Sequence, residues 1–373
     1  STGYRQSRYD YNQMEEQIQR FEAPEHSWFG WNRNYKTAYK QMEAEMSTWN
    51  LHQLDYFGND NIQDWIPRND SHAGWSYIIT GRRRKEEYRE GLLDAYDKEV
   101  KQAREQKTFA KPLLIGSRTQ SAPPYDSLSG ERTNQWKAKS RVVSMMDIYQ
   151  VMAEQTFAAG VQNKMGQTLW YAGGKNETYQ RAIIKRMRKF RQKWISIDYS
   201  KYDQSISSWL IRDAFRLIRS AFNDERFDDQ LYDIIVNDFI NKAFVDGEGK
   251  LRYASKGVPS GSMFTQIVDS IVNKLMIDTY MIAKGIRDYQ VFIMGDDNLV
   301  YLNGVDAIDD LLLDLEGYLR RNFGIEMNAS KSAYGSKFED PEFLSRYWKS
   351  DGEFRQPNIL LAKLIQPERY RDY

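Results

Sequence analysis

Aspartates at two places in this chain are the residues best suited to chemistry. Asp198 ends an alternating, β-branched run that begins at Trp194, a pattern typical of a strand. Asp296 and Asp297 follow Gly295 between two apolar runs, which is typical of a hairpin turn. Carboxylates presented at strand ends and tight turns are the hard oxygen ligands that Mg²⁺ prefers. Taken alone, each segment fits a plain surface turn or strand end equally well.

Asp203 follows Asp198 at a spacing of five residues. This spacing lets the first carboxylate point into a site at the strand end and lets the second return to that site after one turn. The same pair fits a strand-end aspartate followed by a helix N-cap, so the spacing alone decides nothing.

A glycine-containing loop that opens a helix is the more specific signal. Ser260 and Gly261 precede an apolar stretch in which Thr265, Asp269 and Asn273 recur every four residues and therefore share one helix face. The loop frees backbone N–H groups near that face. A capped helix with a hydrated face is the structural alternative. The order and combination of the three segments, rather than any one of them, predict an active site.

The periodicity of the chain predicts the elements that position these residues. The predicted class is α+β, with a small antiparallel sheet that carries helices on one face. We expect residues 85–107 to form a charged helix and residues 111–135 an extended loop. The other predicted elements are strands at 141–146, 194–198 and either side of a turn within 289–302, helices at 148–159, 207–222, 262–283 and 305–323, and a hairpin turn at 246–249.

Composition narrows the classes of function. The chain has 373 residues, 41% hydrophobic and 28% charged, which predicts a soluble globular protein with one large or several interlocked domains. It has no cysteine, which excludes disulfides and thiolate zinc sites, and its three histidines all precede residue 73. No apolar run approaches the roughly 20 residues that span a bilayer, so no membrane partner is predicted. A basic run at 181–193 fits a solvated helix face or a phosphate-contacting surface equally well.

In order and composition the three segments resemble motifs A, B and C of viral RNA-dependent RNA polymerases. The stretch Gly-Val-Pro-Ser-Gly-Ser-Met-Phe-Thr-Gln-Ile-Val-Asp-Ser-Ile-Val-Asn at 257–273 is most similar to the partitivirus and picobirnavirus group of double-stranded RNA viruses. The resemblance covers residues 137–346. It implies a right-hand polymerase with fingers, an RRM-like antiparallel palm sheet and a short or truncated thumb.

The resemblance also implies a division of the chain. Few residues follow Arg346, whereas the thumb of the family is larger, so we expect a C-terminal truncation. The implied parts are an N-terminal segment and fingers at 1–193, palm with motif A at 194–222, a fingers insertion at 223–255, palm with motifs B, C and D at 256–340, and motif E with the start of the thumb at 341–373.

Carried over residue by residue, the resemblance assigns roles to the motif residues. Asp198, Asp296 and Asp297 would hold a pair of Mg²⁺ ions, with Mn²⁺ as a substitute. Asp203 would lie near the ribose hydroxyls of the incoming nucleotide. Many positive-strand polymerases have Asn at position 269, which leaves open how Asp203 and Asp269 share the sugar contacts. The nucleotide and template pocket would be shaped by Ser260, Gly261, Thr265, Asp269 and Asn273.

Three further motifs follow from the same resemblance. Lys331 matches the motif D lysine, the proton donor to the leaving pyrophosphate; a solvated loop lysine is the alternative. Lys137, Lys139 and Arg141 resemble the motif F cations above the triphosphate, with Lys137 also among the RNA contacts. A buried strand pair is the alternative to the last motif, the motif E grip on the growing RNA strand, which is matched by Phe343, Leu344 and Ser345.

These roles imply template-directed transfer of nucleotides from ribonucleoside triphosphates to an RNA 3′-hydroxyl, for viral genome replication and transcription. The implied partners are RNA template and product, ribonucleoside triphosphates and a viral capsid protein. The implied location is the host cytoplasm, inside a virion or replication particle.

Two alternatives stay open. A reverse transcriptase-like polymerase shares the carboxylate motifs, but it usually lacks the glycine before the aspartate pair and the Ser-Gly…Thr…Asn helix. A non-catalytic RNA-binding scaffold could use the same fold. Metal-dependent incorporation of ribonucleotides separates all three.

Overall fold

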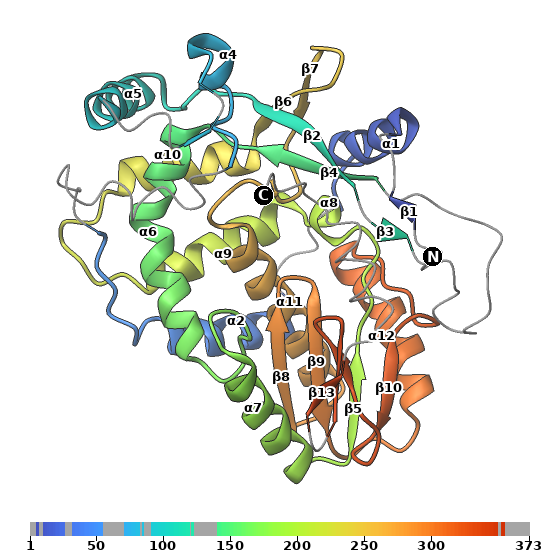
Figure 1. The fold of residues 1–373 in the computed structure, drawn as a ribbon. Helices are drawn as coiled ribbons and strands as arrows, with labels where there is room; N and C mark the ends of the chain where they lie inside the picture. The colour runs from blue at the N-terminus through green and yellow to red at the C-terminus, as the bar shows by residue number, and fades with distance from the viewer. Residues whose placement is uncertain are drawn as a thin grey trace.

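The chain is a mixed α and β protein whose elements are shown in Figure 1. Lys137 and Lys139, two of the predicted site residues, lie outside the described part of the chain. The computed structural model describes residues 5–6, 10–26, 32–54, 71–82, 84–85, 91–119, 121–122, 140–349 and 352–354.

Four strands form the sheet that carries the predicted carboxylates. Their order is β10-β5-β9-β8, and all three pairings are antiparallel, as the sequence predicted. We call this the antiparallel sheet. Its strands are β5 (Lys193–Ser196), β8 (Tyr289–Met294), β9 (Asp297–Leu302) and β10 (Ala333–Ser336).

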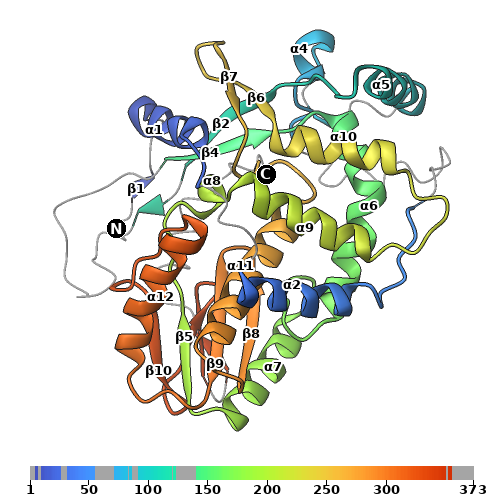
Figure 2. The same ribbon diagram turned by 180° about the vertical axis from the view of Figure 1, so that it is seen from behind.

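Both faces of the antiparallel sheet are buried, because successive side chains of a strand point to opposite faces. Ile195 belongs to the core formed with α11 (Thr265–Ala283) and α12 (Ile308–Phe323), whereas its neighbour Trp194 packs with α7 (Glu177–Phe190). Figure 1 shows α7 on one side of the sheet, and Figure 2, the view from behind, shows α11 and α12 in front of the other side. The prediction of helices on one face is therefore wrong. The second face is also apolar, and α7 buries it.

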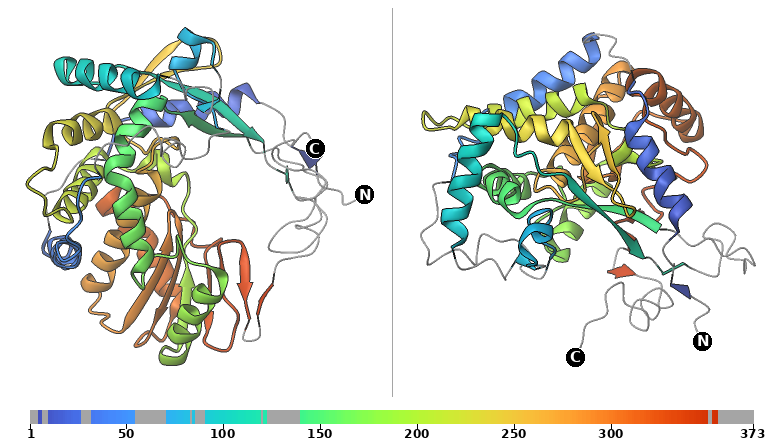
Figure 3. Two further views of the ribbon diagram at one scale, coloured as in Figure 1. Left: turned by 60° about the vertical axis from the view of Figure 1, so that its left-hand side comes forward. Right: turned by 90° about the horizontal axis from the view of Figure 1, so that it is seen from above.

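A second sheet lies at the other end of the molecule, as the left view of Figure 3 shows. Its order is β4-β2-β6-β7; β2 pairs antiparallel with β4 and parallel with β6, and β6 pairs antiparallel with β7. We call it the mixed sheet. Its strands are β2 (Leu113–Thr119), β4 (Ser140–Met145), β6 (Lys242–Val245) and β7 (Leu251–Ala254).

One prediction for the mixed sheet is wrong. Residues 111–135 were predicted as an extended loop, yet 113–119 form β2, an inner strand of the sheet. Its parallel partner β6 is more than a hundred residues away in sequence, so no local pattern could reveal the pairing. Strand β4 and the turn at 246–249 agree with the prediction.

Two N-terminal helices brace the two sheets. Helix α1 (Tyr11–Glu22) packs on the mixed sheet, where the rings of Phe21 and Phe244 lie 5.4 Å apart. Helix α2 (Arg33–Met46) packs across α11, as Figure 2 shows. Residues that carried no readable chemistry in the sequence therefore serve the core.

The predicted helices at 148–159, 207–222, 262–283 and 305–323 are all present, as α6, α9, α11 and α12. Of the predicted helix at 85–107, Leu92–Gln106 form α5, and 86–90 lie outside the described residues. In the described ranges, none of the helices has the length and apolarity to cross a bilayer. The remaining elements are α4 (Ser76–Thr80), α5 (Leu92–Gln106), α6 (Ile148–Gln167), α8 (Tyr202–Ser205), α9 (Ser208–Ser220), α10 (Asp229–Ile240), β1 (Arg5–Gln6), β3 (Ser121–Ala122), β11 (Glu342–Phe343), β12 (Arg346–Trp348) and β13 (Glu353–Phe354).

Candidate active site

The hairpin between β8 and β9 presents two aspartates at the end of the antiparallel sheet. Met294 pairs with Asp297, so Gly295 and Asp296 form a two-residue turn. Gly295 has a φ of 66° at the first central position, where this kind of hairpin turn needs a positive φ. Asp296 and Asp297 are both exposed. The hairpin therefore offers its carboxylates to solvent and not to the core.

Asn298 sets Asp198 beside this hairpin. Beyond the last β5–β9 pair, the Asn298 side chain accepts the N–H of Ile197 at 2.9 Å and donates to its carbonyl at 3.2 Å. The same amide donates to the carbonyl of Asp296 at 3.1 Å. Asp198, the next residue of the chain, is exposed at the same edge. Sequence reasoning missed Asn298; an amide that opens the apolar run after the aspartate pair was the available signal.

Polar residues of α11 hold the hairpin from behind. The Asn273 amide donates to the carbonyls of Gly295 and Asp296 at 2.9 and 3.1 Å. Its oxygen accepts the Tyr199 hydroxyl at 2.9 Å. Ser270, which was not predicted, accepts the Gly295 N–H at 2.8 Å. Asn273 and Ser270 are fully buried, so they position the turn. The nucleotide contact predicted for Asn273 stays a prediction.

Asp203 and Asp269 bring two more carboxylates to this edge. Asp203 lies in the first turn of α8, and Asp269 is buried on α11. Burial and then the charge of Asp296 raise the pKa of Asp203 to about 6. Burial, followed by the charges of Asp203 and Asp296, raises the pKa of Asp269 well above its ordinary value. The three acids are therefore electrostatically coupled. Within the described residues, Oδ1 of Asp269 has no hydrogen-bond partner.

Arg141 brings a positive charge to these acids from β4. Its charge lowers the pKa of Asp203 and of Asp297. The net pKa of Asp297 is nevertheless raised to about 6, by desolvation at the packed sheet edge and then by neighbouring carboxylates, Asp296 foremost and Asp198 among them. The structure thus brings the predicted cation to the predicted acids.

The carboxylates have the donor set of a divalent-cation site. As they stand, no three acidic or histidine side chains of the described residues are gathered into a ligand cluster. Asp296 and Asp198 still raise the pKa of Asp297, which shows a concentration of negative charge at the edge. A bound divalent cation would offset that charge, and carboxylate oxygens are its preferred ligands. The chemistry of these carboxylates therefore fits such an ion, and the choice of Asp198 and Asp296 as its ligands stays a prediction.

Ser260 and Gly261 are pressed against β4 of the mixed sheet. The Ser144 N–H donates to Oγ of Ser260 at 2.9 Å, and the Gly261 N–H donates to Oγ of Ser144 at 3.3 Å. A Cβ on Gly261 would lie 2.5 Å from the carbonyl oxygen of Ser144 and 2.9 Å from the backbone nitrogen of Met146. Only glycine fits this approach. The loop thereby joins α11 to the strand that carries Arg141.

The end of this loop is closed by Thr265 and Glu154. The Thr265 hydroxyl donates to the carbonyls of Pro259 and Ser262 at 2.6 and 2.9 Å. Oε2 of Glu154, on α6, accepts the Ser262 hydroxyl and the Met263 N–H, both at 2.8 Å. Burial raises the pKa of Glu154 to about 8. Sequence reasoning missed Glu154, because one acid in an apolar helix gives no periodic signal.

Lys331 lies on a loop that is bonded to the backbone of Asp198. The Asn328 N–H donates to the Asp198 carbonyl at 2.9 Å, and the Asp198 N–H donates to Oγ of Ser332 at 3.1 Å. Lys331 is exposed between these two contacts. Its place agrees with the motif match, while its role as a proton donor stays a prediction.

Phe343, Leu344 and Ser345 belong to the β11–β12 hairpin. Phe343 pairs with Arg346, and the two residues between them have φ values of 55° and 57°. Two successive positive φ values define a turn that usually takes Asn-Gly, so leucine is strained there. Phe343 is a core residue whose ring lies 5.3 Å from that of Phe292. The RNA contacts of all three residues stay a prediction.

The basic run at 181–193 folds mainly as α7. Arg188 pairs with Asp340 and Arg191 with Asp288, both at 3.1 Å. Ion pairs therefore use part of the run. Its exposed cations on α7 are Lys185, Arg186 and Lys189.

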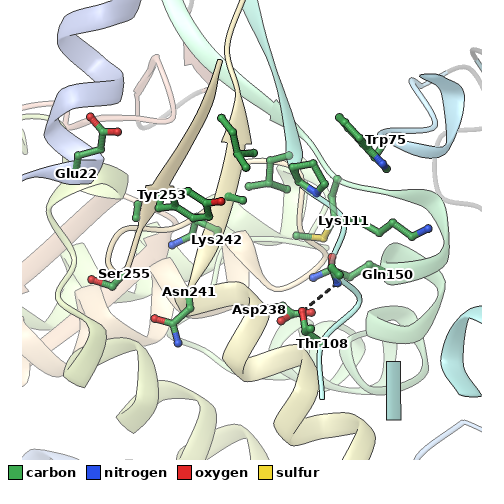
Figure 4. A pocket seen from close by; sticks show the side chains of 17 residues that line it. Glu22, Trp75, Thr108, Lys111, Gln150, Asp238, Asn241, Lys242, Tyr253 and Ser255 are labelled. Carbon is green, nitrogen blue, oxygen red and sulfur yellow. Dashed lines mark hydrogen bonds between the residues drawn. The ribbon is translucent and has the colours of Figure 1, made fainter. Parts of the chain in front are cut away.

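A cavity of about 740 Å³ opens beside the mixed sheet and is shown in Figure 4. Trp75, Met146 and Tyr253 line it together with the polar side chains of Asn241 and Lys242. None of the candidate metal-binding carboxylates belongs to its walls. The candidate chemistry therefore lies at the exposed sheet edge and not in this cavity.

The chain is similar to a viral polymerase family and to several viral proteins. The family model described as viral RNA-dependent RNA polymerase matches residues 2–360. The chain is 31% identical over 185 residues to the RNA-directed RNA polymerase of Cryptosporidium parvum virus 1 (strain KSU-1), covering 46% of this chain and 33% of that protein. It is 33% identical over 138 residues to the RNA-directed RNA polymerase of Atkinsonella hypoxylon virus (isolate 2H), covering 34% and 20%.

A third match is to the genome polyprotein of poliovirus type 1 (strain Mahoney). It is 30% identical over 172 residues, which is 44% of this chain and 7% of that protein. The chain thus spans a third or less of the length of these curated relatives. The family resemblance drawn from the sequence motifs is confirmed by these matches.

Proposed function

Because the chain belongs to the viral RNA-dependent RNA polymerase family, we propose that it transfers ribonucleotides to an RNA 3′-hydroxyl under the direction of an RNA template. The observation that carries this proposal is the meeting of Asp198 and Asp296 at one sheet edge. Asp198 follows β5 and Asp296 lies in the β8–β9 turn, and the Asn298 side chain bonds to the backbone of Ile197 and of Asp296. The proposed role is viral genome replication and transcription.

We assign the antiparallel sheet with α11 and α12 to the palm and the mixed sheet to the fingers. The β2–β6 pairing supports this division, because it joins the proposed fingers regions 1–193 and 223–255. The palm would then comprise 194–222 and 256–340, and 341–373 would hold motif E and the start of the thumb.

The proposed resident ions are a pair of Mg²⁺, with Mn²⁺ as a substitute, held by Asp198, Asp296 and Asp297. When bound, they would activate the attacking hydroxyl and neutralise charge on the triphosphate. The side chains of the protein would then position the carboxylates that hold these ions. Asn273 and Asn298 keep the carboxylates in register, as their contacts with the hairpin backbone support.

Three side chains would act on the nucleotide. Arg141 would face the triphosphate, which is consistent with its influence on the edge acids. Lys331 would donate a proton to the departing pyrophosphate. Asp203 would face the sugar hydroxyls together with Asp269, whose Oδ1 has no hydrogen-bond partner in the described part of the chain. The loop at Ser260 would support the base and template.

The proposed ligands are RNA template and product and ribonucleoside triphosphates. Their recognition would depend on backbone and sugar contacts, because base choice comes from pairing with the template. Association with a viral capsid protein, and a location in the host cytoplasm inside a virion or replication particle, are proposed on the family resemblance alone.

The deciding experiment is incorporation of labelled nucleotides on a defined RNA template with Mg²⁺. We expect the chain to extend RNA with ribonucleotides, and Asp296→Asn to bind RNA without extending it. Extension with deoxyribonucleotides in preference would instead support a reverse transcriptase-like enzyme. RNA binding without incorporation by the unaltered chain would support the non-catalytic scaffold.

A further inference from the structure

A buried lysine supports the candidate nucleotide loop from the mixed sheet. Lys242 begins β6 and is 4% exposed. Its ammonium donates to the carbonyls of Ile240, Lys256 and Gly257 at 2.9, 2.8 and 2.8 Å. An ammonium has three hydrogens, so every donor of Lys242 is used on a backbone carbonyl. Burying a charged amine is costly unless it is hydrogen-bonded, and these three bonds supply that compensation. Lys242 therefore does more than fill space in the core.

The peptide segment that Lys242 holds also holds α8. The Gly257 N–H donates to the Ile206 carbonyl at 2.8 Å, and the Val258 N–H donates to the Asp203 carbonyl at 2.7 Å. Asp203 lies in the first turn of α8, and Ile206 directly follows its last residue, so the segment is bonded to α8 near both ends of the helix. The carbonyls of Lys256 and Gly257 therefore accept hydrogen bonds from Lys242, while the amides of Gly257 and Val258 donate to the backbone of α8 and its C-cap.

The segment has little freedom to take another path. Gly257 has a φ of 73°, and a Cβ there would lie 2.6 Å from the Phe21 ring and 3.0 Å from the Asp203 carbonyl oxygen. Tyr202 supplies a second support for α8, since its hydroxyl donates to the Asp269 carbonyl at 2.9 Å. Helix α8 is therefore held from two sides: by the loop that Lys242 binds, and by α11 through the Tyr202 hydroxyl.

We propose that Lys242 is a positioning residue for the sugar end of the nucleotide site. By fixing the carbonyls of Lys256 and Gly257, it sets where α8 places Asp203 relative to Asp269. The inference rests on the proposed function, because it concerns sugar recognition at that same site. Lys242 itself touches neither carboxylate; it lines the cavity beside the mixed sheet (Figure 4) and acts through the backbone.

The lowered basicity of Lys242 agrees with this geometry. Burial lowers its pKa to about 7, because desolvation disfavours the charged ammonium.

The chain offers a matched control in Lys175. Its ammonium also donates to backbone carbonyls, those of Gly166 and Tyr171 at 2.6 and 2.5 Å, and burial lowers its pKa to about 8. Those acceptors belong to the end of α6 and the segment that follows it, not to the loop at 256–265. Lys175→Met therefore removes similar chemistry from a site whose carbonyl acceptors, on Gly166 and Tyr171, make no direct bond to α8.

The kinetic test compares Lys242→Met with Lys175→Met in the full chain. We expect Lys242→Met to raise the KM for a ribonucleoside triphosphate, and to lower the ratio of ribonucleotide to deoxyribonucleotide specificity constants, each on the order of tenfold. Lys175→Met should change neither quantity, even where both variants lose a similar amount of thermal stability. An unchanged ratio in an active, folded Lys242→Met overturns the inference.

Hydrogen exchange supplies a readout that needs no activity. The Gly257 and Val258 amides should exchange faster in Lys242→Met, on the order of tenfold for one lost anchor, and at the original rate in Lys175→Met. Unchanged exchange at both amides in Lys242→Met would show that Lys242 is not the anchor. Lys242→Gln, which keeps two donors on a shorter side chain, should shift both readouts in the same direction by less, and it replaces the methionine variant if that one does not fold.

The two hypotheses fail in different ways. An unaltered chain that incorporates no nucleotide contradicts the proposed function, and the sugar-selection inference falls with it. An active unaltered chain whose Lys242→Met variant selects sugars normally overturns the inference alone.

Discussion

The carboxylate edge of the antiparallel sheet and the loop at 256–265 are built in opposite ways. At the edge, the backbone that carries the exposed aspartates is held by buried neutral amides, those of Asn273 and Asn298. In the loop, neutral backbone groups are held by buried ionisable side chains, Lys242 and Glu154. The aspartates proposed to hold metal stay in contact with solvent, whereas the ionisable groups that hold the loop are buried.

This contrast predicts how each region responds to substitution. An exposed acid can be replaced with little effect on folding, because few of its contacts lie in the core. A loop pressed against another strand cannot, because packing leaves no room for added atoms. Substitutions at the edge should therefore lower activity without lowering stability, whereas substitutions in the loop should lower both.

The largest effect is expected at the edge. Asp296→Asn should lower incorporation by at least about a thousandfold, because an amide is a poor replacement for a carboxylate ligand of a divalent cation. The melting temperature and RNA affinity should stay close to those of the unaltered chain. Incorporation with saturating Mg²⁺, thermal melting and RNA binding measure the three quantities. Asp198→Asn should behave alike, and appreciable incorporation by either variant would remove that residue from the proposed metal site.

Gly261→Ala should damage stability and activity together. The added Cβ would lie 2.5 Å from the Ser144 carbonyl oxygen, so the loop or β4 must shift, at a cost of about 1–3 kcal/mol in the free energy of unfolding. Denaturant unfolding and incorporation rates measure the two effects. The matched control is Gly160→Ala within α6, where the nearest atom is 4.0 Å away and alanine should be neutral or stabilising. Equal stability of the two variants would contradict the tight packing of the loop.

Asp203→Ala should weaken sugar selection more than it weakens incorporation. A site built to hydrogen-bond a hydroxyl loses discrimination when the bonding group is removed, and a fall on the order of tenfold or more is expected. The quantity to measure is the ratio of specificity constants for ribonucleotides and deoxyribonucleotides. If that ratio stays the same, Asp203 only supports α8 and its carboxylate does not contact the sugar.

The smallest effect concerns pH and Glu154. Burial raises its pKa in the folded chain to about 8, from an ordinary value of 4.5, so the folded state binds the proton more tightly than the unfolded state does. Stability from this group is therefore present at low pH and decreases as pH rises from about 5 to about 8. Glu154→Gln keeps an oxygen for Ser262 and Met263 and should remove that decrease. Melting temperatures across this pH range should fall less in the variant, and parallel curves would rule out the buried acid as their cause.

Much of the fold could be predicted from the sequence where local pattern and structure coincide. The alternating runs around Asp198 and Gly295 gave the strands of the antiparallel sheet, and the four-residue spacing of Thr265, Asp269 and Asn273 gave α11. The candidate carboxylates followed from the same segments. These elements carry their own signal, because one strand or helix already shows which of its faces is buried.

The rest could not be predicted because it depends on distant partners. The pairing of β2 with β6 and the cover of the second sheet face by α7 join segments with no shared pattern. Lys242 and Glu154 are single polar residues among apolar neighbours, and only the folded chain shows the carbonyls, hydroxyl and amide that they bind. Sequence patterns therefore revealed residues that recur with helix or strand spacing better than single residues that bind distant parts of the chain.

The close approach of Gly261 to β4 has an evolutionary consequence. Every single-base change of a glycine codon that alters the amino acid adds a Cβ, and here a Cβ would lie 2.5 Å from the Ser144 carbonyl oxygen. No single nucleotide substitution at this codon therefore leads to a residue that fits. Another residue can replace Gly261 only if the backbone at 144–146 moves first.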